Sequence, residues 1–390
     1  MPDRNPLKRP INVLHLVVTL PVGGIEQRLK ELVLRYSKEE FRPIVCCLRD
    51  KSVIGREIER HGIEVIELDR MRRHQFDPIL VWKLYRLMLE REIQVVATDE
   101  YHASLYGRLG ARWAKVPAVV STVHNVYRRK LSHRFRINRV LARWSDRIIA
   151  VSNRVKADLL RFDRVSPSKV EVVPNGIDPR RFEDLSPKAE ARKKLSLPEN
   201  AFLIGTVGRL SIAKGHHDLL SAFRLLMDEE GRPDLRLVLI GDGPLREELT
   251  QTVQQMGLEK VVFFLGTRRD VPDCLSALDL FVFPSLWEGQ GIALVEAMAA
   301  RLPIVCADYE GAREIVSDGV EALLVEPKEP RRLKEGIVRL LRDEGLGRSL
   351  SAAARSRAVT DFSVQGMVRE HERFYKEILR TKGILLDGRQ

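Results

Sequence analysis

The segment LFVFPSLWEGQGIALVEAMAARLPIVC, residues 280–306, decides the fold. It contains two short apolar runs, Leu280–Phe283 and Ile304–Cys306, and between them Ile292–Ala300 is rich in Ala and Leu. Short apolar runs bounded by Pro or Gly are typical of buried strands, whereas the longer Ala- and Leu-rich run favours a helix. The segment therefore predicts a strand, a loop, a helix and a second strand parallel to the first.

The same alternation extends along the whole chain. In the second half we expect further strands at Leu203–Val207, Leu237–Ile240, Val261–Leu265 and Ala322–Val325. In the first half we expect strands at Val13–Val18, Pro43–Leu48, Val65–Leu68, Val95–Ala97, Ala118–Thr122, Ile148–Val151 and Val170–Val173. This pattern predicts an α/β protein with two doubly wound, Rossmann-like domains. Open sheets of this kind bind ligands beyond the carboxyl ends of their strands, so we expect the chemistry there.

The two domains need a boundary, and residues 184–200 suit a linker. They carry Asp, Ser, Pro, Lys and Glu with little apolar periodicity. We therefore expect an N-terminal domain over residues 1–183 and a C-terminal domain over 201–365. Residues 366–390 are predicted to form a helical tail that packs back on the body, with Phe374, Tyr375, Ile378 and Leu379 on one stripe.

Positive charge is concentrated in the first half of the chain. Residues 1–180 hold 35 Lys and Arg against 21 Asp and Glu, whereas residues 181–390 hold 31 against 33. A basic face attracts anionic partners such as phosphates or acidic lipid surfaces. The sequence has no aromatic RNA-binding motif and no Cys/His finger, so no motif in it indicates a nucleic-acid partner.

The sequence also indicates the compartment. No stretch approaches the ~18 uninterrupted apolar residues that a membrane span needs. The run from Ile11 to Val22 lacks a small-residue cleavage site, so we interpret it as a first strand instead of a signal peptide. Cys46, Cys47, Cys274 and Cys306 lack metal-ligand spacing, which indicates reduced cysteines in a cytoplasmic protein.

Two motifs follow predicted strands and suit a phosphorylated ligand. In Gly208-Arg209-Leu210-Ser211-Ile212-Ala213-Lys214-Gly215, Arg209 and Lys214 lie in a loop before a helix, where a guanidinium fork and an ammonium group favour a diphosphate. In the segment Pro284–Met298, Gly289 and Gly291 allow backbone N–H groups to approach a ligand closely. By contrast, the segment Gly241–Arg246 has Arg246 where GxGxxG has its third glycine, which argues against a dinucleotide site.

The second motif also contains Glu288 and Glu296, which lie eight residues apart. Eight residues of helix would separate them by ~12 Å, beyond the ~5 to 9.5 Å between the two carboxyl groups of a glycosidase. We therefore expect them to accept hydrogen bonds from hydroxyl groups at two places on an extended ligand.

These motifs resemble the retaining glycosyltransferases of family 4, which contain the glycosyl transferases group 1 domain. The resemblance covers nearly the whole chain and implies the GT-B fold, in which two Rossmann-like domains face each other across a cleft. Glu288 and Glu296 match the family's Glu-x7-Glu element, and Arg209 and Lys214 match its diphosphate-binding cations. The resemblance implies that Glu288 lies near the donor sugar and Glu296 near the ribose.

The resemblance assigns further donor contacts. Gly23 and Gly24 look like the loop that closes over the donor phosphates, and His124 falls where the family has a histidine near the donor sugar. Arg268 lies near the strand end that contacts the base. Gln290 replaces the usual Phe, which suggests altered donor choice. The expected catalytic residues are His124, Arg209, Lys214 and Glu288, and the expected donor-binding residues are Gly23, Gly24, Arg268, Gly289, Gln290, Gly291, Ile292, Leu294 and Glu296.

Residues 127–145 carry seven Arg or Lys side chains and no acidic one before Ser145, with apolar residues at roughly helical spacing. Such a helix can lie on an anionic membrane surface, or it can bury its apolar stripe in the domain core. Both interpretations stay open. A lipid contact would place the protein at the inner face of the membrane.

The resemblance thus implies transfer of a sugar, with retention, from a UDP- or GDP-sugar, and we expect a lipid-linked or other envelope glycan as the acceptor. Such an activity belongs to lipopolysaccharide or exopolysaccharide synthesis. No metal is expected, since no Asp-x-Asp cluster lies at a predicted strand end. The alternatives are a sugar-nucleotide epimerase and a catalytically silent nucleotide-sugar-binding member of a polysaccharide assembly.

Overall fold

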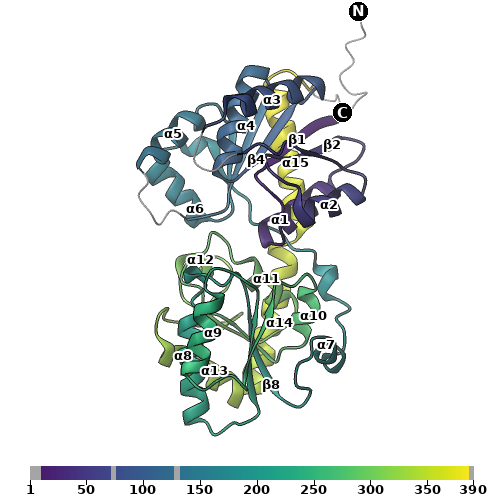
Figure 1. The fold of residues 1–390 in the computed structure, drawn as a ribbon. Coiled ribbons are helices and arrows are strands. Elements are labelled where there is room, and N and C mark those ends of the chain that lie inside the picture. Colours follow the sequence, from purple (N-terminus) through teal and green to yellow (C-terminus); the bar gives the residue numbers. More distant parts are fainter. Residues whose placement is uncertain (1–9, 72–75, 127–131, 386–390) are drawn as a thin grey trace, which may run out of the picture. The chain divides into compact units, whose positions relative to one another are not determined.

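The structure is a computed structural model that describes residues 10–71, 76–126 and 132–385. It divides into two compact units, residues 1–176 with 364–390 (unit 1) and residues 177–363 (unit 2). Each unit is a parallel sheet between layers of helices (Figure 1).

Within the described residues, unit 1 has a seven-stranded parallel sheet in the order β3-β2-β1-β4-β5-β6-β7. The strands are β1 (Ile11–Val17), β2 (Phe41–Cys47), β3 (Glu64–Glu67), β4 (Val95–Asp99), β5 (Ala118–Val123), β6 (Arg147–Ala150) and β7 (Val170–Val172). The helices are α1 (Gly24–Arg35), α2 (Ser52–Arg60), α3 (Pro78–Glu90), α4 (Tyr101–Ala114), α5 (Ser132–Ala142), α6 (Asn153–Asp158) and α15 (Val364–Thr381).

Over the same part of the chain, unit 2 has a six-stranded parallel sheet in the order β10-β9-β8-β11-β12-β13. The strands are β8 (Phe202–Val207), β9 (Leu235–Ile240), β10 (Val262–Gly266), β11 (Leu280–Phe283), β12 (Ile304–Ala307) and β13 (Leu323–Val325). The helices are α7 (Lys188–Lys194), α8 (His216–Glu229), α9 (Arg246–Gln255), α10 (Val271–Ser276), α11 (Ile292–Ala299), α12 (Glu310–Arg313), α13 (Pro330–Arg342) and α14 (Glu344–Asp361).

Each sheet is buried on both faces, because alternate residues of a strand point to opposite sides. In β1, Val13 and Val17 belong to the core that includes α15, whereas Leu14 and Leu16 belong to the core that includes α3 and α4. Cys46 and Cys47 lie on opposite faces for the same reason, and all four cysteines are buried and free of disulfides.

The domain limits differ from those we expected. Residues 184–200 are part of unit 2, since α7 lies within them and Ala191, Leu195 and Leu197 are buried in the unit 2 core. The chain changes unit at 176/177 and again at 363/364. There the Ile177 N–H donates to the Phe362 carbonyl at 2.9 Å, so the two crossing segments are held together.

The helical tail packs on unit 1. Its stripe of Phe374, Tyr375, Ile378 and Leu379 is buried in the core that contains β1 and α1 (Figure 1, yellow). Among the helices that the structure describes, none is both long and apolar enough to cross a membrane.

Candidate functional site

The two predicted motif loops of unit 2 lie side by side at its sheet. β8 and β11 are neighbouring strands whose connections leave in opposite directions, so the loops 208–215 and 284–291 both begin at the switch point of the sheet. The Leu286 N–H donates a hydrogen bond of 2.8 Å to the Ala213 carbonyl and joins them. The structure therefore has both motif loops directly after strands, as the sequence predicts.

Glycine permits the close packing of these two loops. Gly215 has φ +63°, and a Cβ there would lie 2.0 Å from the carbonyl oxygen of Pro284. A Cβ at Gly291 would lie 2.8 Å from the ring of Phe283. Neither position accepts a side chain without movement of a neighbouring loop or ring, so both glycines fix the shape of the site.

Lys214 and Glu288 meet at this point as an ion pair, with side chains only 19% and 15% exposed. The Ser285 hydroxyl donates to the same Glu288 oxygen at 2.9 Å. The Lys214 ammonium group also lies 5.5 Å from the centre of the Phe283 ring. The fold thus brings one cation and one carboxylate together in a half-buried site. There a phosphate could replace Glu288 as the partner of Lys214, and a hydroxyl group could donate to Glu288 in place of Lys214.

Arg209 is the exposed cation of the first loop. The adjacent residue Leu210 anchors the loop, because its N–H donates to the Asp242 carbonyl at 3.0 Å and its carbonyl accepts from Leu245 at 3.0 Å. Over the described ranges, the Arg209 guanidinium has no ion-pair partner. It therefore offers a free fork to an anion.

Glu296 lies on α11 and is partly buried. Burial raises the pKa of its carboxyl group to about 7, and the charge of Arg181 offsets this shift only in part. With a pKa near neutral pH, the group can donate a hydrogen bond to a hydroxyl when protonated and accept one when ionised.

The other expected donor contacts of this loop differ in their surroundings. Gly289 and Gln290 are buried, and the Ile292 N–H donates to the Gln290 carbonyl at 3.1 Å. The expected donor contact at Leu294 stays a prediction, and in the structure its side chain packs in the core while its N–H is bound to the Gly291 carbonyl at 3.0 Å.

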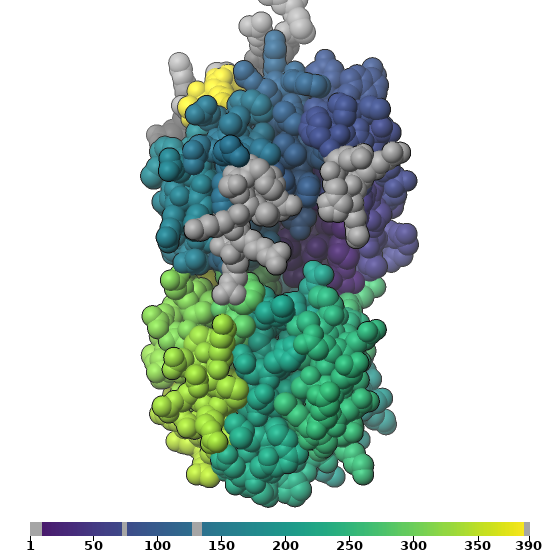
Figure 2. Space-filling view, turned by 60° about the vertical axis from the view of Figure 1, so that its left-hand side comes forward, coloured from purple at the N-terminus to yellow at the C-terminus, as the bar shows by residue number. Residues whose placement is uncertain are grey.

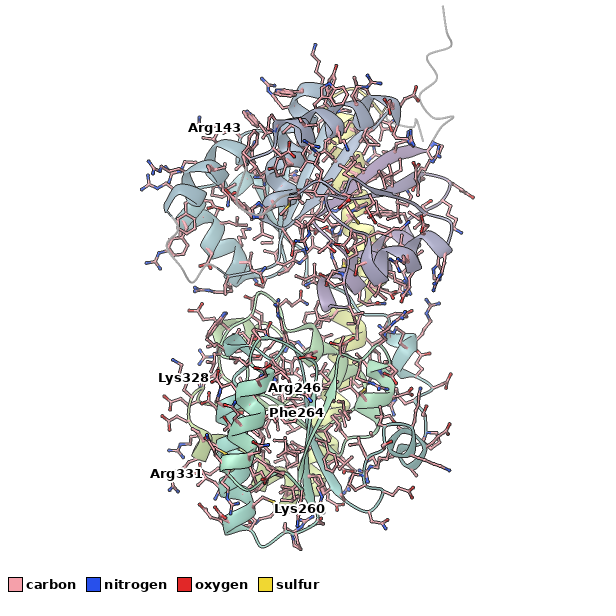
Figure 3. All side chains as sticks on the ribbon, in the orientation of Figure 1. Arg143, Arg246, Lys260, Phe264, Lys328 and Arg331 are labelled. Atoms are coloured by element: carbon pink, nitrogen blue, oxygen red, sulfur yellow. The ribbon has the colours of Figure 1, made fainter. Side chains whose placement is uncertain are left out.

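Two arginines near β9 and β10 are engaged in other contacts. Arg268 follows β10, the edge strand, and its guanidinium is bound by Asp270 at 2.9 and 2.6 Å. Among the described residues, no hydrogen bond or ion pair joins Arg268 to Lys214 or Glu288. The Arg246 guanidinium lies 4.4 Å from the centre of the Phe264 ring, and both residues are labelled in Figure 3.

In unit 1, the Gly23-Gly24 turn follows β1 and starts α1, with extended backbone at Gly23 (φ −170°). His124 lies just after β5 and is buried. Its Nε2 hydrogen bonds to Asp99 Oδ1 at 2.8 Å, and Arg28 Nη1 donates to the same oxygen at 3.3 Å. The second nitrogen of Arg28 donates to His371 Nε2 at 2.7 Å.

These contacts settle the charges in the cluster. Burial alone would raise the pKa of Asp99, but Arg28 and the hydrogen bond from His124 outweigh it and hold that pKa well below its usual value. Burial lowers the pKa of His124, despite the opposing effect of Asp99. Asp99 is therefore ionised and His124 neutral at pH 7, with its proton on Nε2.

Sequence reasoning missed Asp99, Arg28 and His371. The pair Asp99-Glu100 at a strand end was a usable signal, since acidic residues just after a strand are typical of sites. His371 gave none, because it lies 343 residues after Arg28 and only the packing of α15 brings them together.

The basic stretch 127–145 is described only in part, because residues 127–131 lie outside the described ranges. In α5, Leu141 and Ala142 are buried, whereas Ile137 and Val140 are 37% and 47% exposed. Arg143 projects from the surface of unit 1 (Figure 3), on the side that Figure 2 brings forward in teal. Part of the apolar stripe thus packs in the core and part is exposed between arginines.

No group of three or more His, Cys, Asp or Glu side chains that could hold a metal ion occurs in the part of the chain that the structure describes.

Family comparisons match both units. A model described as Glycosyltransferase Family 4 matches residues 22–181, and one described as Glycosyl transferases group 1 matches residues 187–357.

Individual relatives agree with these matches. The chain is 30% identical over 307 residues to the UDP-Gal:α-D-GlcNAc-diphosphoundecaprenol α-1,3-galactosyltransferase of Escherichia coli, which covers 77% of this chain and 79% of that one. It is 29% identical over 250 residues to the lipopolysaccharide core biosynthesis mannosyltransferase LpsB of Rhizobium meliloti, with 62% and 69% covered. The crystal structure of Anabaena Alr3699/HepE with UDP and glucose has a TM-score of 0.84 and 25% identity, over 94% of this chain and 99% of that one.

Proposed function

Since this chain belongs to glycosyltransferase family 4 and is an enzyme that uses a nucleotide-sugar donor, we propose that it transfers the sugar with retention onto a lipid-linked envelope glycan. The two Rossmann-like units are those of the GT-B fold. The observation that carries the proposal is the meeting of Lys214 and Glu288 at the switch point of the unit 2 sheet.

We propose that the donor diphosphate binds Arg209 and Lys214. The free fork of Arg209 and the half-buried ammonium group of Lys214 support this role, because a partly dry site strengthens their attraction for phosphate. An incoming diphosphate takes Lys214 from Glu288, and the released carboxylate accepts hydrogen bonds from sugar hydroxyls. Glu296, in the next helix, then accepts hydrogen bonds from the ribose.

In the reaction, the bond between the anomeric carbon and the diphosphate oxygen breaks, and a bond to the acceptor oxygen forms on the same face. The acceptor hydroxyl gives its proton to the leaving phosphate oxygen. Arg209 and Lys214 stabilise the negative charge that grows on the diphosphate. This scheme needs no metal ion, and we propose that turnover is independent of divalent cations.

The proposed acceptor is a sugar linked to a lipid through diphosphate. The Escherichia coli relative acts on a diphosphoundecaprenol-linked sugar, and the basic composition of residues 1–180 suits an anionic substrate.

A membrane contact of unit 1 would bring the enzyme to such an acceptor. Ile137 and Val140 are exposed on α5 beside Arg136 and Arg143, a combination that binds anionic lipid surfaces. Sedimentation with vesicles containing one-third phosphatidylglycerol should bring down the wild type. Val140→Glu should reduce the bound fraction, and equal binding of both proteins would remove this part of the proposal.

The experiment for the proposed function uses synthetic undecaprenyl-diphosphate N-acetylglucosamine with a panel of UDP- and GDP-sugars. We expect one donor to extend the acceptor by one sugar, with EDTA having no effect, and the ¹H NMR coupling at the new anomeric carbon to match that of the donor. An inverted anomer would contradict retention. Conversion of the donor without an acceptor product would favour an epimerase instead.

A further inference from the structure

A tyrosine of unit 2 lies beside the Lys214–Glu288 pair, and none of the roles above uses it. Tyr309 lies between β12 and α12, and the centre of its ring is 6.5 Å from the centre of the Phe283 ring. The Lys214 ammonium group lies 5.5 Å from the centre of the same Phe283 ring. Tyr309 and Lys214 therefore pack around one aromatic ring at the candidate site.

The backbone holds the Tyr309 side chain in place. The Tyr309 N–H donates to the Ala307 carbonyl at 3.1 Å, and the Tyr309 carbonyl accepts from the Ala312 N–H at 2.9 Å. A Cβ at Gly311 would lie 2.8 Å from Tyr309 Cε2 and 3.3 Å from the Glu288 carbonyl oxygen. Gly311 thus lets the tyrosine ring and the loop that carries Glu288 approach each other closely.

The Tyr309 hydroxyl is buried, and it has no hydrogen-bond partner among the residues that the structure describes. Burial, to which the charge of Glu288 adds, raises the pKa of this hydroxyl well above its usual value. The hydroxyl therefore keeps its proton and is a donor without an acceptor. A buried polar group without a partner lowers the stability of the fold, so its presence calls for a role.

The Glu288 carboxylate has an oxygen that can accept from this donor. Its Oε1 is bound by both the Lys214 ammonium group and the Ser285 hydroxyl. Over the described ranges of the chain, no side chain donates to its Oε2. In the proposed site a diphosphate takes Lys214 away, and a half-buried carboxylate that loses its cation needs another donor.

We infer that Tyr309 is a positioning residue, whose hydroxyl donates a hydrogen bond to the Glu288 carboxylate once a diphosphate has taken Lys214 from it. This bond fixes the carboxylate so that its remaining lone pairs face the sugar hydroxyls. The inference rests on the proposed function, because it takes a diphosphate at Lys214 as given. Tyr309 acts through Glu288 and touches no substrate itself.

Two single variants, their combination and a control test the inference in the full chain. Tyr309→Phe removes the hydroxyl and keeps the ring, and Glu288→Ala removes the carboxylate on which the hydroxyl is inferred to act. Tyr375→Phe is the control for folding. It also removes one buried hydroxyl, but this hydroxyl has a partner in unit 1, the Tyr36 hydroxyl at 3.3 Å.

The first readout is the melting temperature without a ligand. Tyr309→Phe should melt at or above the wild-type temperature, because the hydroxyl that it loses has no partner. Tyr375→Phe should melt at a lower temperature, because it breaks a hydrogen bond in the core. A fall for Tyr309→Phe as large as that for Tyr375→Phe would show that the Tyr309 hydroxyl is already bound, and the inference would be wrong.

The second readout is calorimetric titration with UDP and with GDP. The Kd of the nucleoside diphosphate that binds should be ~10-fold higher in Tyr309→Phe, because the released carboxylate loses a hydrogen bond to a charged group. In a Glu288→Ala background, Tyr309→Phe should leave the Kd unchanged, since the hydroxyl acts through that carboxylate. Equal Kd values for the wild type and Tyr309→Phe, or a tenfold effect that persists without Glu288, would overturn the inference and leave the proposed function intact.

The third readout follows the hydrogen bond itself by NMR. In protein labelled with ¹³C at tyrosine Cζ, the resonance that Tyr309→Phe lacks should move when the nucleoside diphosphate is added, and it should not move in Glu288→Ala. A wild-type resonance that stays in place would overturn the inference. A wild type that binds the nucleoside diphosphate but transfers no sugar would overturn the proposed function, while this resonance still decides on Tyr309. A wild type that binds neither UDP nor GDP would overturn both.

Discussion

Donor affinity should depend on pH through Glu296. The pKa of this carboxyl group is raised to about 7 by burial, with Arg181 opposing the shift. In the proposed site the ionised form of Glu296 accepts hydrogen bonds from the ribose, so below pH 7 donor binding would also release a proton. About one Glu296 carboxyl group in eleven is ionised at pH 6 and about ten in eleven at pH 8. The apparent Kd of the donor should therefore be ~10-fold higher at pH 6 than at pH 8, which corresponds to ~1.4 kcal/mol of binding free energy.

Calorimetric titration between pH 5.5 and 8.5, with the nucleotide sugar that the donor panel identifies, measures this dependence, because the diphosphate of a nucleotide sugar does not itself titrate there. Glu296→Gln is the control and should bind weakly with little dependence on pH. A wild type whose Kd is flat over this range, or a Glu296→Gln variant that keeps the tenfold change, would show that donor binding does not depend on the ionisation of Glu296.

The same group should affect stability with a defined sign. Its folded-state pKa is raised, so the folded protein holds more protons than the unfolded chain between the ordinary carboxyl pKa and about 7. The stability that this group contributes is complete below the ordinary value and is lost as pH rises through about 7. Urea unfolding of Glu296→Gln should lack that loss.

Three further predictions concern the loops 208–215 and 284–291 of unit 2. Lys214→Ala should lower kcat by ~10²- to 10³-fold in steady-state assays with an unchanged melting temperature; normal turnover would exclude its role. Gly215 and Gly257 have nearly equal φ, +63° and +64°, but a Cβ at Gly215 would lie 2.0 Å from the Pro284 carbonyl oxygen, whereas a Cβ at Gly257 would meet no atom within 4 Å. In urea unfolding, Gly257→Ala should therefore lower the free energy of unfolding by ~1 kcal/mol and Gly215→Ala by several times that amount. Gln290→Phe should change the kcat/KM ratio between donor sugars ~10-fold with unchanged affinity for the free nucleoside diphosphate; an unchanged ratio would show that this position does not select the sugar.

The strands and the unit 2 loops could be predicted from sequence because their signals are local. The apolar runs at Leu203–Val207 and Leu280–Phe283 lie within β8 and β11, and the loops that follow them hold Lys214 and Glu288 in contact. Parallel strands bring their carboxyl ends to one edge, so residues after two strands meet without any long-range information.

Other features depend on packing between distant segments and could not be predicted. Residues 184–200 are polar enough to resemble a linker, yet Ala191 and Leu195, four residues apart, bury one side of α7. The Arg28–His371 contact exists only because α15 returns to unit 1. The left-handed backbone at Glu100 has no sequence signal, since glycine is the residue expected there.

We propose that the loops after β8 and β11 of unit 2 hold the nucleotide sugar for transfer. Release of nucleoside diphosphate, measured with and without undecaprenyl-diphosphate N-acetylglucosamine, tests it most directly. We expect the wild type to release UDP or GDP from one donor of the panel much faster with the acceptor present, and we expect Lys214→Ala to lose this release. Acceptor-dependent release that Lys214→Ala retains in full, or no such release from any donor, would contradict it.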